Sequence, residues 1–161
     1  MGRKNNRLKD YDYSRAGAYF LTICTKDNHK ILGKVVGDGV LDVLYCKLSE
    51  IGKIVDMQIQ TMNNLYKHVQ VEEYVIMPNH IHLIIFVDNN GSSRTPTPTN
   101  AAIPSFISTL KRYTNKACGL SIWQRSYHDH IIRNGPDYLR IWQYIEQNPA
   151  KWTEDRYFVD G

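Results

Sequence analysis

The sequence predicts an α+β fold in which helices pack against an antiparallel sheet. Segments rich in aromatic and β-branched residues alternate with segments of helical periodicity, in the order strand, hairpin, helix, strand pair, helix, strand, helix. The longest apolar stretch, residues 74–87, is interrupted only by a turn and two histidines. The chain has 161 residues, 42% of them hydrophobic, which suits one domain with a substantial core.

The first half of the chain is expected to hold a strand, a hairpin and a helix. Residues 19–25 are rich in aromatic and β-branched side chains and predict the first strand. Glycines bracket residues 33–40, which suits a short edge hairpin. Ser49 is a typical N-cap for a helix that runs to about Tyr66, because apolar residues recur on one face: Ile51, Ile54, Val55, Ile59 and Met62.

The centre of the chain predicts two antiparallel strands, residues 74–77 and 80–87, joined by a tight turn at Pro78-Asn79. Side chains alternate faces along a strand, so His80 and His82 project from one face roughly 6–7 Å apart. Two imidazoles at this spacing can converge on one metal ion. A solvent-facing or hydrogen-bonded pair would have the same spacing, so the pair alone does not assign a site.

The second half begins with residues 88–102, which we expect to be a flexible loop because their Asn, Gly, Ser and Thr-Pro composition cannot pack. Residues 103–117 predict an amphipathic helix with Gly119 as its C-cap. Residues 122–133 predict a strand, and Asn134-Gly135-Pro136 ends it and opens a third helix over residues 136–148. The second helix is expected to point Ile103, Phe106, Ile107, Leu110 and Thr114 inward, and Lys111, Arg112 and Lys116 outward.

These elements together predict a ferredoxin-like sheet with two helices on one face. The third helix is left over and is free to lie across the histidine face. In it, Tyr144 and Asn148 are four residues apart and share one side of the helix. A phenolic hydroxyl and an amide oxygen presented together can complete a site begun by two histidines. Alternatively, Tyr144 packs in the core and Asn148 simply ends the helix.

The net charge of +4 permits nucleic-acid binding without requiring it. An N-terminal arm, residues 1–17, is basic. Three cysteines without CxxC spacing predict reduced thiols, and no apolar run reaches the roughly 18 residues of a membrane helix. We therefore expect a soluble, cytoplasmic protein. Its candidate DNA contacts are basic residues of the arm and of the second half: Arg3, Lys4, Arg7, Lys111, Arg112, Lys116, Arg125, Arg133 and Arg140.

Three sequence blocks occur in the order found in one protein family. They are Tyr-Val-Ile-Met-Pro-Asn-His-Ile-His at 74–82, Trp-Gln-Arg-Ser-Tyr-His-Asp-His-Ile-Ile-Arg at 123–133, and Tyr-Ile-x-x-Asn-Pro at 144–149. Together they resemble the single-tyrosine transposases of the HUH class, most of all the REP-associated tyrosine transposases. The resemblance runs from Arg7 to Trp152 and implies a single transposase-like domain over residues 1–161.

The resemblance implies a role for individual residues. His80 and His82 would be the histidine–hydrophobic–histidine metal pair, Tyr144 the nucleophile, and Asn148 the third metal ligand, where relatives often have glutamine. The implied reaction is cleavage and strand transfer of single-stranded DNA beside a hairpin, through a 5′-phosphotyrosine. The implied metal is Mg²⁺ or Mn²⁺, and the protein would associate with the nucleoid when bound to DNA. Both a monomer and a homodimer are consistent with the sequence.

The chemistry of these residue types agrees with such a reaction. A free tyrosine has a pKa near 10 and is a poor nucleophile at neutral pH unless a base accepts its proton or its phenolate is stabilised. A divalent cation held by His80, His82 and Asn148 would offset charge that develops at phosphorus. Imidazole ligands favour Mn²⁺, whereas cellular abundance favours Mg²⁺.

Four alternatives remain beside this assignment. Tyr113, in the most basic helix, is a second candidate nucleophile. Asp129 and His130 could orient Tyr144 or hydrogen-bond a metal-ligating histidine, or could form a purely structural pair. The protein could also be a catalytically inactive, domesticated DNA-binding module, or a metal-dependent hydrolase that uses His80 and His82 with a bound water.

Overall fold

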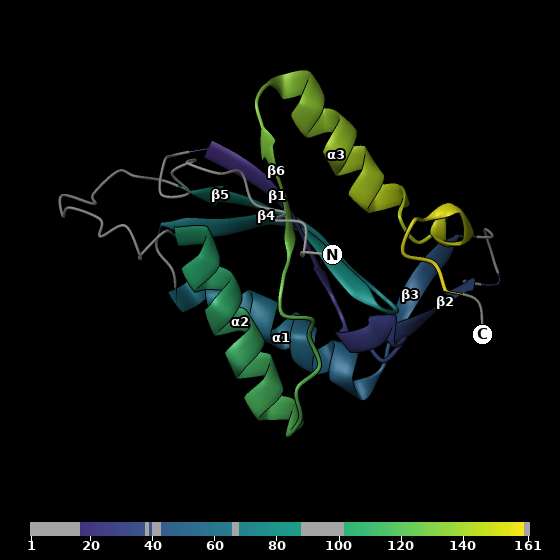
Figure 1. The fold of residues 1–161 in the computed structure, drawn as a ribbon. Helices are drawn as coiled ribbons and strands as arrows, with labels where there is room; N and C mark the ends of the chain where they lie inside the picture. The colour runs from purple at the N-terminus through teal and green to yellow at the C-terminus, as the bar shows by residue number, and fades with distance from the viewer. Residues whose placement is uncertain (1–16, 38, 40–42, 66–67, 88–101, 160–161) are drawn as a thin grey trace, which may run out of the picture.

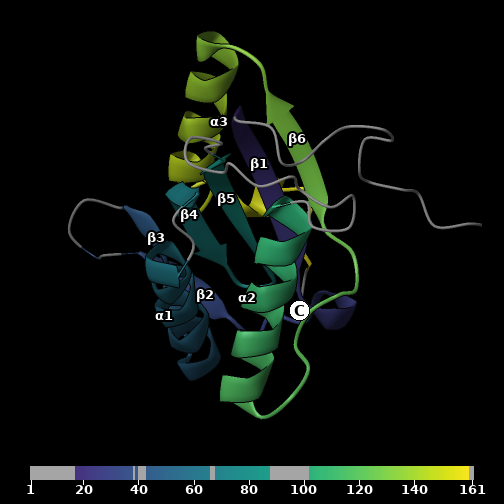
Figure 2. The same cartoon turned by 90° about the vertical axis from the view of Figure 1, so that its left-hand side faces the viewer.

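A four-stranded antiparallel sheet forms the centre of the molecule in the computed structural model, which describes residues 17–37, 39, 43–65, 68–87 and 102–159. Its strands are β1 (Gly17–Cys24), β4 (Val69–Met77), β5 (His80–Val87) and β6 (His128–Ile132), in the order β4-β5-β1-β6. Helices α1 (Glu50–Leu65) and α2 (Ala102–Cys118) cover one face, and α3 (Gly135–Gln147) lies over the other (Figure 1, Figure 2). This is the predicted α+β, ferredoxin-like arrangement.

The helices on the first face form where the periodicity placed them. The Ser49 hydroxyl accepts a hydrogen bond from the Gly52 N–H at 3.0 Å and so caps α1. At the end of α2, Gly119 has a φ of +76° and donates its N–H to the Asn115 carbonyl, as expected for a C-cap. The predicted inward residues of α2 are all buried, as are Val55, Ile59 and Met62 of α1. Each fully buried aliphatic side chain contributes about 1.5–3 kcal/mol relative to an exposed one.

A second sheet of two strands, β2 (Gly33–Gly37) and β3 (Leu44–Leu48), differs from the predicted hairpin. The prediction placed both strands within residues 33–40, whereas the second strand begins only at Leu44. Leu44, Tyr45 and Lys47 are exposed, so β3 lacks the buried face whose alternating pattern would have revealed it.

The predicted strand over residues 122–133 is correct only for its last part, since β6 begins at His128. Before it, the indole N–H of Trp123 donates to the Thr114 hydroxyl at 2.6 Å inside the core. Lys111 was expected to point outward, but its ammonium group donates at 2.7, 3.1 and 3.3 Å to the carbonyls of Gln124, Arg125 and Ser126. These contacts take up carbonyls that a strand would present to a neighbouring strand.

Alternation along β5 divides its side chains between the two faces. Ile81, Leu83, Ile85 and Val87 enter the core beneath α1 and α2, whereas Ile84 faces α3. A cluster of four buried isoleucines, which we call the isoleucine cluster, joins α3 to the sheet: Ile84, Ile132, Ile141 and Ile145. The two histidines of β5 share the face of Ile84, so α3 lies over the histidine face as expected.

Two of the expected segments fall largely outside the described residues. These are the basic arm, with Arg3, Lys4 and Arg7, and the expected loop except for Ala102. Among the helices of the described part, none has the length and apolar character needed to cross a membrane.

Candidate active site

The imidazoles of His80 and His82 lie side by side on the central strand β5, with ring centroids 4.6 Å apart and almost no exposed surface. His80 Nδ1 lies 2.7 Å from the Asn79 Oδ1, and His82 Nδ1 lies 2.8 Å from the Thr22 hydroxyl. The Asn79 amide nitrogen donates to the carbonyl of Tyr157 at 2.8 Å, so its Oδ1 must accept from His80. His80 therefore carries its proton on Nδ1 and presents a lone pair on Nε2.

Burial keeps both rings neutral. It lowers the pKa of His80, against the opposing effect of the Asp155 carboxylate. It also lowers the pKa of His82, and repulsion from His80 when that ring is protonated, and from the Arg156 guanidinium, lowers it further. The Nε2 atoms of both rings are buried and have no hydrogen-bond partner among the described residues. Buried, neutral imidazole nitrogens whose other nitrogen is held by a polar group are typical metal ligands.

Two candidate oxygen ligands approach the histidines, one from the C-terminal end of α3 and one from the segment after it. Asn148 is 2% exposed, and its amide nitrogen donates to Asp155 Oδ2 at 2.9 Å. Its Oδ1 is buried without a partner among the described residues. One ligand atom each from His80, His82 and Asp155 lies within 4.8 Å of the others. Two nitrogens and amide or carboxylate oxygens fit a divalent cation such as Mn²⁺.

The hydroxyl of Tyr144 lies beside this cluster. It donates to Asp155 Oδ2 at 3.4 Å, and the tyrosine ring packs 5.3 Å from the His82 ring. Burial and the Asp155 charge raise the pKa of Tyr144 to about 12, although its hydrogen bond with Asn148 opposes this shift. The phenol is therefore protonated at neutral pH and already contacts a carboxylate that can accept its proton. The side chain remains 39% exposed, so a substrate can reach it.

Sequence reasoning missed the residues that follow α3. Asp155 touches both Tyr144 and Asn148, and the Tyr157 ring lies 4.6 Å from the His80 ring. These residues belong to no motif, and their approach depends on the chain turning back after a short 3₁₀ helix, η2 (Trp152–Glu154). The clustering of Trp152, Asp155 and Tyr157 just after the tyrosine helix was the only available signal.

Asp129 and the second candidate tyrosine lie away from the site, whereas His130 lines a cavity together with His82 and Tyr144. Asp129 pairs in register with Leu21, whose side chain enters the α1–α2 core, so Asp129 faces away from the histidines. His130 lies on the α3 side and contacts Asp137 at 2.9 Å. Tyr113 packs against the α1–α2 core, with the Arg112 guanidinium 5.5 Å from its ring centre. Neither Asp129 nor Tyr113 is therefore brought to the histidines.

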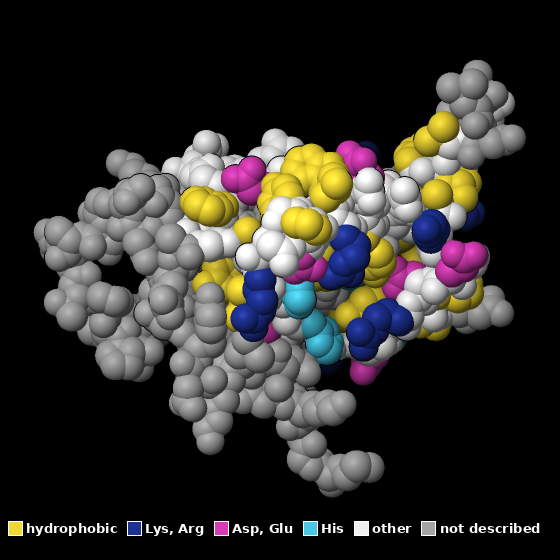
Figure 3. Space-filling view, turned by 90° about the horizontal axis from the view of Figure 1, so that it is seen from above, with side chains coloured by type: hydrophobic (Ala, Val, Ile, Leu, Met, Phe, Trp, Pro, Cys, Tyr) yellow, Lys and Arg dark blue, Asp and Glu magenta, His cyan; other side chains and the backbone are white. Residues whose placement is uncertain are grey.

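Of the predicted basic DNA contacts in the described part, Arg140 alone lines a cavity beside Tyr144. Arg112 and Lys116 are exposed on α2, on the other side of the sheet (Figure 1). Arg125 and Arg133 are exposed before and after β6. Figure 3 shows the molecule from above, and on this surface Lys and Arg side chains lie around the exposed histidine side chains.

The fold and site together define a class of protein: a ferredoxin-like domain with a buried histidine pair on a central strand and a tyrosine-bearing helix packed over it. No family model matches the chain. The chain is 30% identical to an uncharacterized protein of Haemophilus influenzae, over 98% of this chain and 94% of that protein. It is 33% identical to the REP-associated tyrosine transposase of Escherichia coli, over 51% of this chain and 45% of that protein.

The fold is shared with a solved structure, that of a REP-associated tyrosine transposase bound to a REP hairpin. The TM-score is 0.64 at 22% identity, over 91% of this chain and 73% of the other. These comparisons confirm the resemblance of the three sequence blocks to the REP-associated tyrosine transposases. Its relatives and its His80–His82–Asp155 group indicate a transposase-like, metal-dependent function.

Proposed function

We propose that the protein cleaves and rejoins single-stranded DNA through Tyr144. One observation carries the proposal: beside this tyrosine, three buried ligand atoms have no partner among the described residues, namely Nε2 of His80, Nε2 of His82 and Oδ1 of Asn148. A solved structure with this fold is that of a transposase bound to a REP hairpin. We therefore propose a single-stranded DNA hairpin with a flanking single strand as the substrate.

His80 and His82, together with oxygens of Asn148 and Asp155, would hold a divalent cation. When bound, the cation supplies positive charge that offsets the negative charge developing on the phosphate oxygens. Two imidazole ligands favour Mn²⁺ over Mg²⁺. Thr22 and Asn79 hold the two Nδ1 atoms and so keep both Nε2 atoms directed at the ion.

The proposed reaction exchanges one phosphodiester bond for another. The Tyr144 oxygen attacks phosphorus and forms a tyrosine–phosphate bond, while its proton passes to the Asp155 carboxylate that it already contacts. The bond between phosphorus and the 3′ oxygen breaks, and that oxygen takes up a proton and leaves as a 3′-hydroxyl. The product is a 5′-phosphotyrosine, and the reverse reaction joins strands without ATP.

Tyr144 is proposed to act within its own chain. Its ring lies 5.3 Å from that of His82 and 6.0 Å from that of Phe20 in the same molecule. A tyrosine supplied by a second copy would require α3 to leave the isoleucine cluster, which exposes apolar surface.

The test is incubation of labelled single-stranded hairpin DNA with the protein and Mn²⁺, followed by denaturing electrophoresis. We expect a protein-linked DNA band that requires the metal and vanishes in Tyr144→Phe. Tyr138→Phe, on the same helix, and Tyr113→Phe, on the opposite face, are matched controls that should retain the band.

Other outcomes would contradict this proposal. Cleavage that survives Tyr144→Phe without a covalent band would indicate hydrolysis by water. A band that vanishes in Tyr113→Phe instead would identify that residue as the nucleophile. DNA binding without cleavage of any hairpin under any metal would favour an inactive binding module.

A further inference from the structure

Two cavities flank Tyr144, and their charges differ. The first, of about 340 Å³, is lined by two basic residues, Arg140 and Lys151, and by two acidic ones, Glu154 and Asp155. The second, of about 300 Å³, lies between α3 and the sheet and is bounded by Phe20, His82, Arg140, Tyr144, Arg156 and Tyr157, among others. Among the described residues that line the second cavity, none carries a carboxylate. An anionic group next to the tyrosine is therefore better accommodated in the second cavity.

The two arginines of the second cavity come from different elements. Arg140 is on α3, one helical turn before Tyr144, and Arg156 follows η2 in the segment that returns to the histidines. The Arg156 guanidinium lies 5.2 Å from the centre of the Tyr157 ring, which limits its positions.

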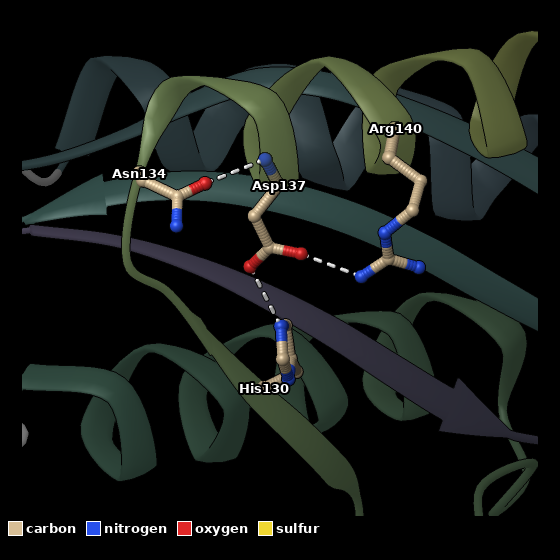
Figure 4. Close-up of polar contacts among 4 residues, drawn as sticks. All are labelled: His130, Asn134, Asp137 and Arg140. Carbon is tan, nitrogen blue, oxygen red and sulfur yellow. Dashed lines mark hydrogen bonds and ion pairs between the residues drawn. The ribbon is translucent and has the colours of Figure 1, made fainter.

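Arg140 is held in place by contacts at the start of α3. Asp137 Oδ1 accepts from the Arg140 guanidinium at 2.5 Å, and Asp137 Oδ2 lies 2.9 Å from His130 Nε2 (Figure 4). The Asn134 side chain caps the same turn by accepting from the Asp137 N–H at 2.8 Å. A guanidinium has five N–H donors, so this contact leaves others for a ligand. The Arg140 side chain is 69% exposed and is therefore accessible to a ligand.

We propose that Arg140 and Arg156 form a phosphate clamp in the cavity between α3 and the sheet, which binds the backbone of single-stranded DNA next to the phosphate that Tyr144 attacks. This inference rests on the proposed function and extends it to the path of the strand. Guanidinium groups bind phosphate oxygens through paired N–H donors. Phe20 and Tyr157 supply aromatic surface in the same cavity for the attached nucleotide.

The clamp is tested by binding rather than by activity. All variants carry Tyr144→Phe and are studied in EDTA, so neither cleavage nor metal enters the measurement. The probe is a fluorescently labelled DNA hairpin with a single-stranded flank, and anisotropy gives its affinity at several salt concentrations. Arg140→Gln and Arg156→Gln are compared with Lys53→Gln, which removes one exposed positive charge from α1.

We expect each arginine variant to bind about tenfold more weakly at low salt. Each should also reduce the slope of log affinity against log salt by about 0.7, the contribution of one phosphate contact on single-stranded DNA. Lys53→Gln should retain the parent slope. On a hairpin without the flank, parent and variants should bind equally, because the clamp contacts the single strand.

Two results would overturn the clamp: slopes for Arg140→Gln and Arg156→Gln equal to that of Lys53→Gln, or equal weakening on the hairpin without its flank. Thermal unfolding of each variant checks that the fold is intact. The proposed function fails separately, by absence of the covalent band in the enzyme with Tyr144. A normal covalent band, combined with salt slopes that the arginine variants leave unchanged, would reject the clamp but not the proposed function.

Discussion

Replacing Asn79 with alanine should weaken metal binding, although this side chain is not itself an expected ligand. Asn79 is fully buried in the turn between β4 and β5. Its Oδ1 accepts from His80 Nδ1 at 2.7 Å, and its amide nitrogen donates to the Tyr157 carbonyl at 2.8 Å. The change removes the group that fixes the tautomer and the orientation of the His80 ring.

The magnitude follows from these two hydrogen bonds. Leaving the His80 N–H and the Tyr157 carbonyl unpaired costs about 1–3 kcal/mol each, so we expect a loss of about 2–6 kcal/mol in the free energy of unfolding. For a domain of this size that corresponds to a Tm lower by roughly 4–24 °C. Metal affinity should fall by about 10- to 100-fold, as it does when a group that orients a ligand histidine is removed.

Calorimetric titration with Mn²⁺ and thermal unfolding in EDTA measure the two effects separately. The matched control is Asn63→Ala, because Asn63 Oδ1 accepts from the Val71 N–H at 2.7 Å on the other side of the sheet. It should lower Tm while leaving the Kd for Mn²⁺ unchanged. An unchanged Kd for Mn²⁺ in Asn79→Ala, or an equal loss of Mn²⁺ affinity in both variants, would refute the reasoning.

Three further results are expected in thermal unfolding. Mn²⁺ at 100 times its Kd should add about 2.7 kcal/mol and raise Tm by roughly 5–10 °C, and His82→Ala should abolish this shift. In EDTA, Tm should fall as the pH drops from 6.5 toward 4. In this pH range His80 and His82 bind protons in the unfolded chain, whereas in the folded protein burial lowers the pKa of both, that of His80 to about 4. A Tm that does not change with pH would contradict this. Gly52→Ala should cost about 3 kcal/mol, because its Cβ would overlap the Leu32 carbonyl, whereas Gly135→Ala, with open space around it, should stabilise by about 0.5 kcal/mol.

The parts of the fold that the sequence predicted are those with local signals. Ser49, Gly119 and the apolar faces of α1 and α2 mark those helices through capping chemistry and period, and both helices agree with the prediction. The turn at Pro78-Asn79 placed the central hairpin correctly, although its first strand begins at Val69 and not at Tyr74 as predicted. Residues 122–127 look like a strand in composition, but only Trp123 makes a single bridge to Thr25, whereas the carbonyls of residues 124–126 accept from Lys111 on α2. Such tertiary contacts override local preference.

The residues of the candidate site likewise divide into those with a local sequence signal and those without one. His80, His82, Tyr144 and Asn148 were identifiable because they lie in blocks shared with a family, and the structure brings them together. The residues that complete the surroundings, such as Asn79, Asp155 and Arg156, have no local signature. Their roles depend on a turn and a C-terminal segment meeting in space, which composition and periodicity do not encode.

The isoleucine cluster has a consequence for local unfolding. The histidines belong to β5, which is hydrogen-bonded on both sides, whereas Tyr144 belongs to a helix that one small apolar cluster attaches to the sheet. Opening of α3 exposes far less apolar surface than opening of the sheet, so its free energy is lower. Amide hydrogens of α3 should therefore exchange with solvent before those of β1 and β5. The nucleophile would then be carried by the part of the molecule that opens most readily, above a histidine pair in the part that opens last.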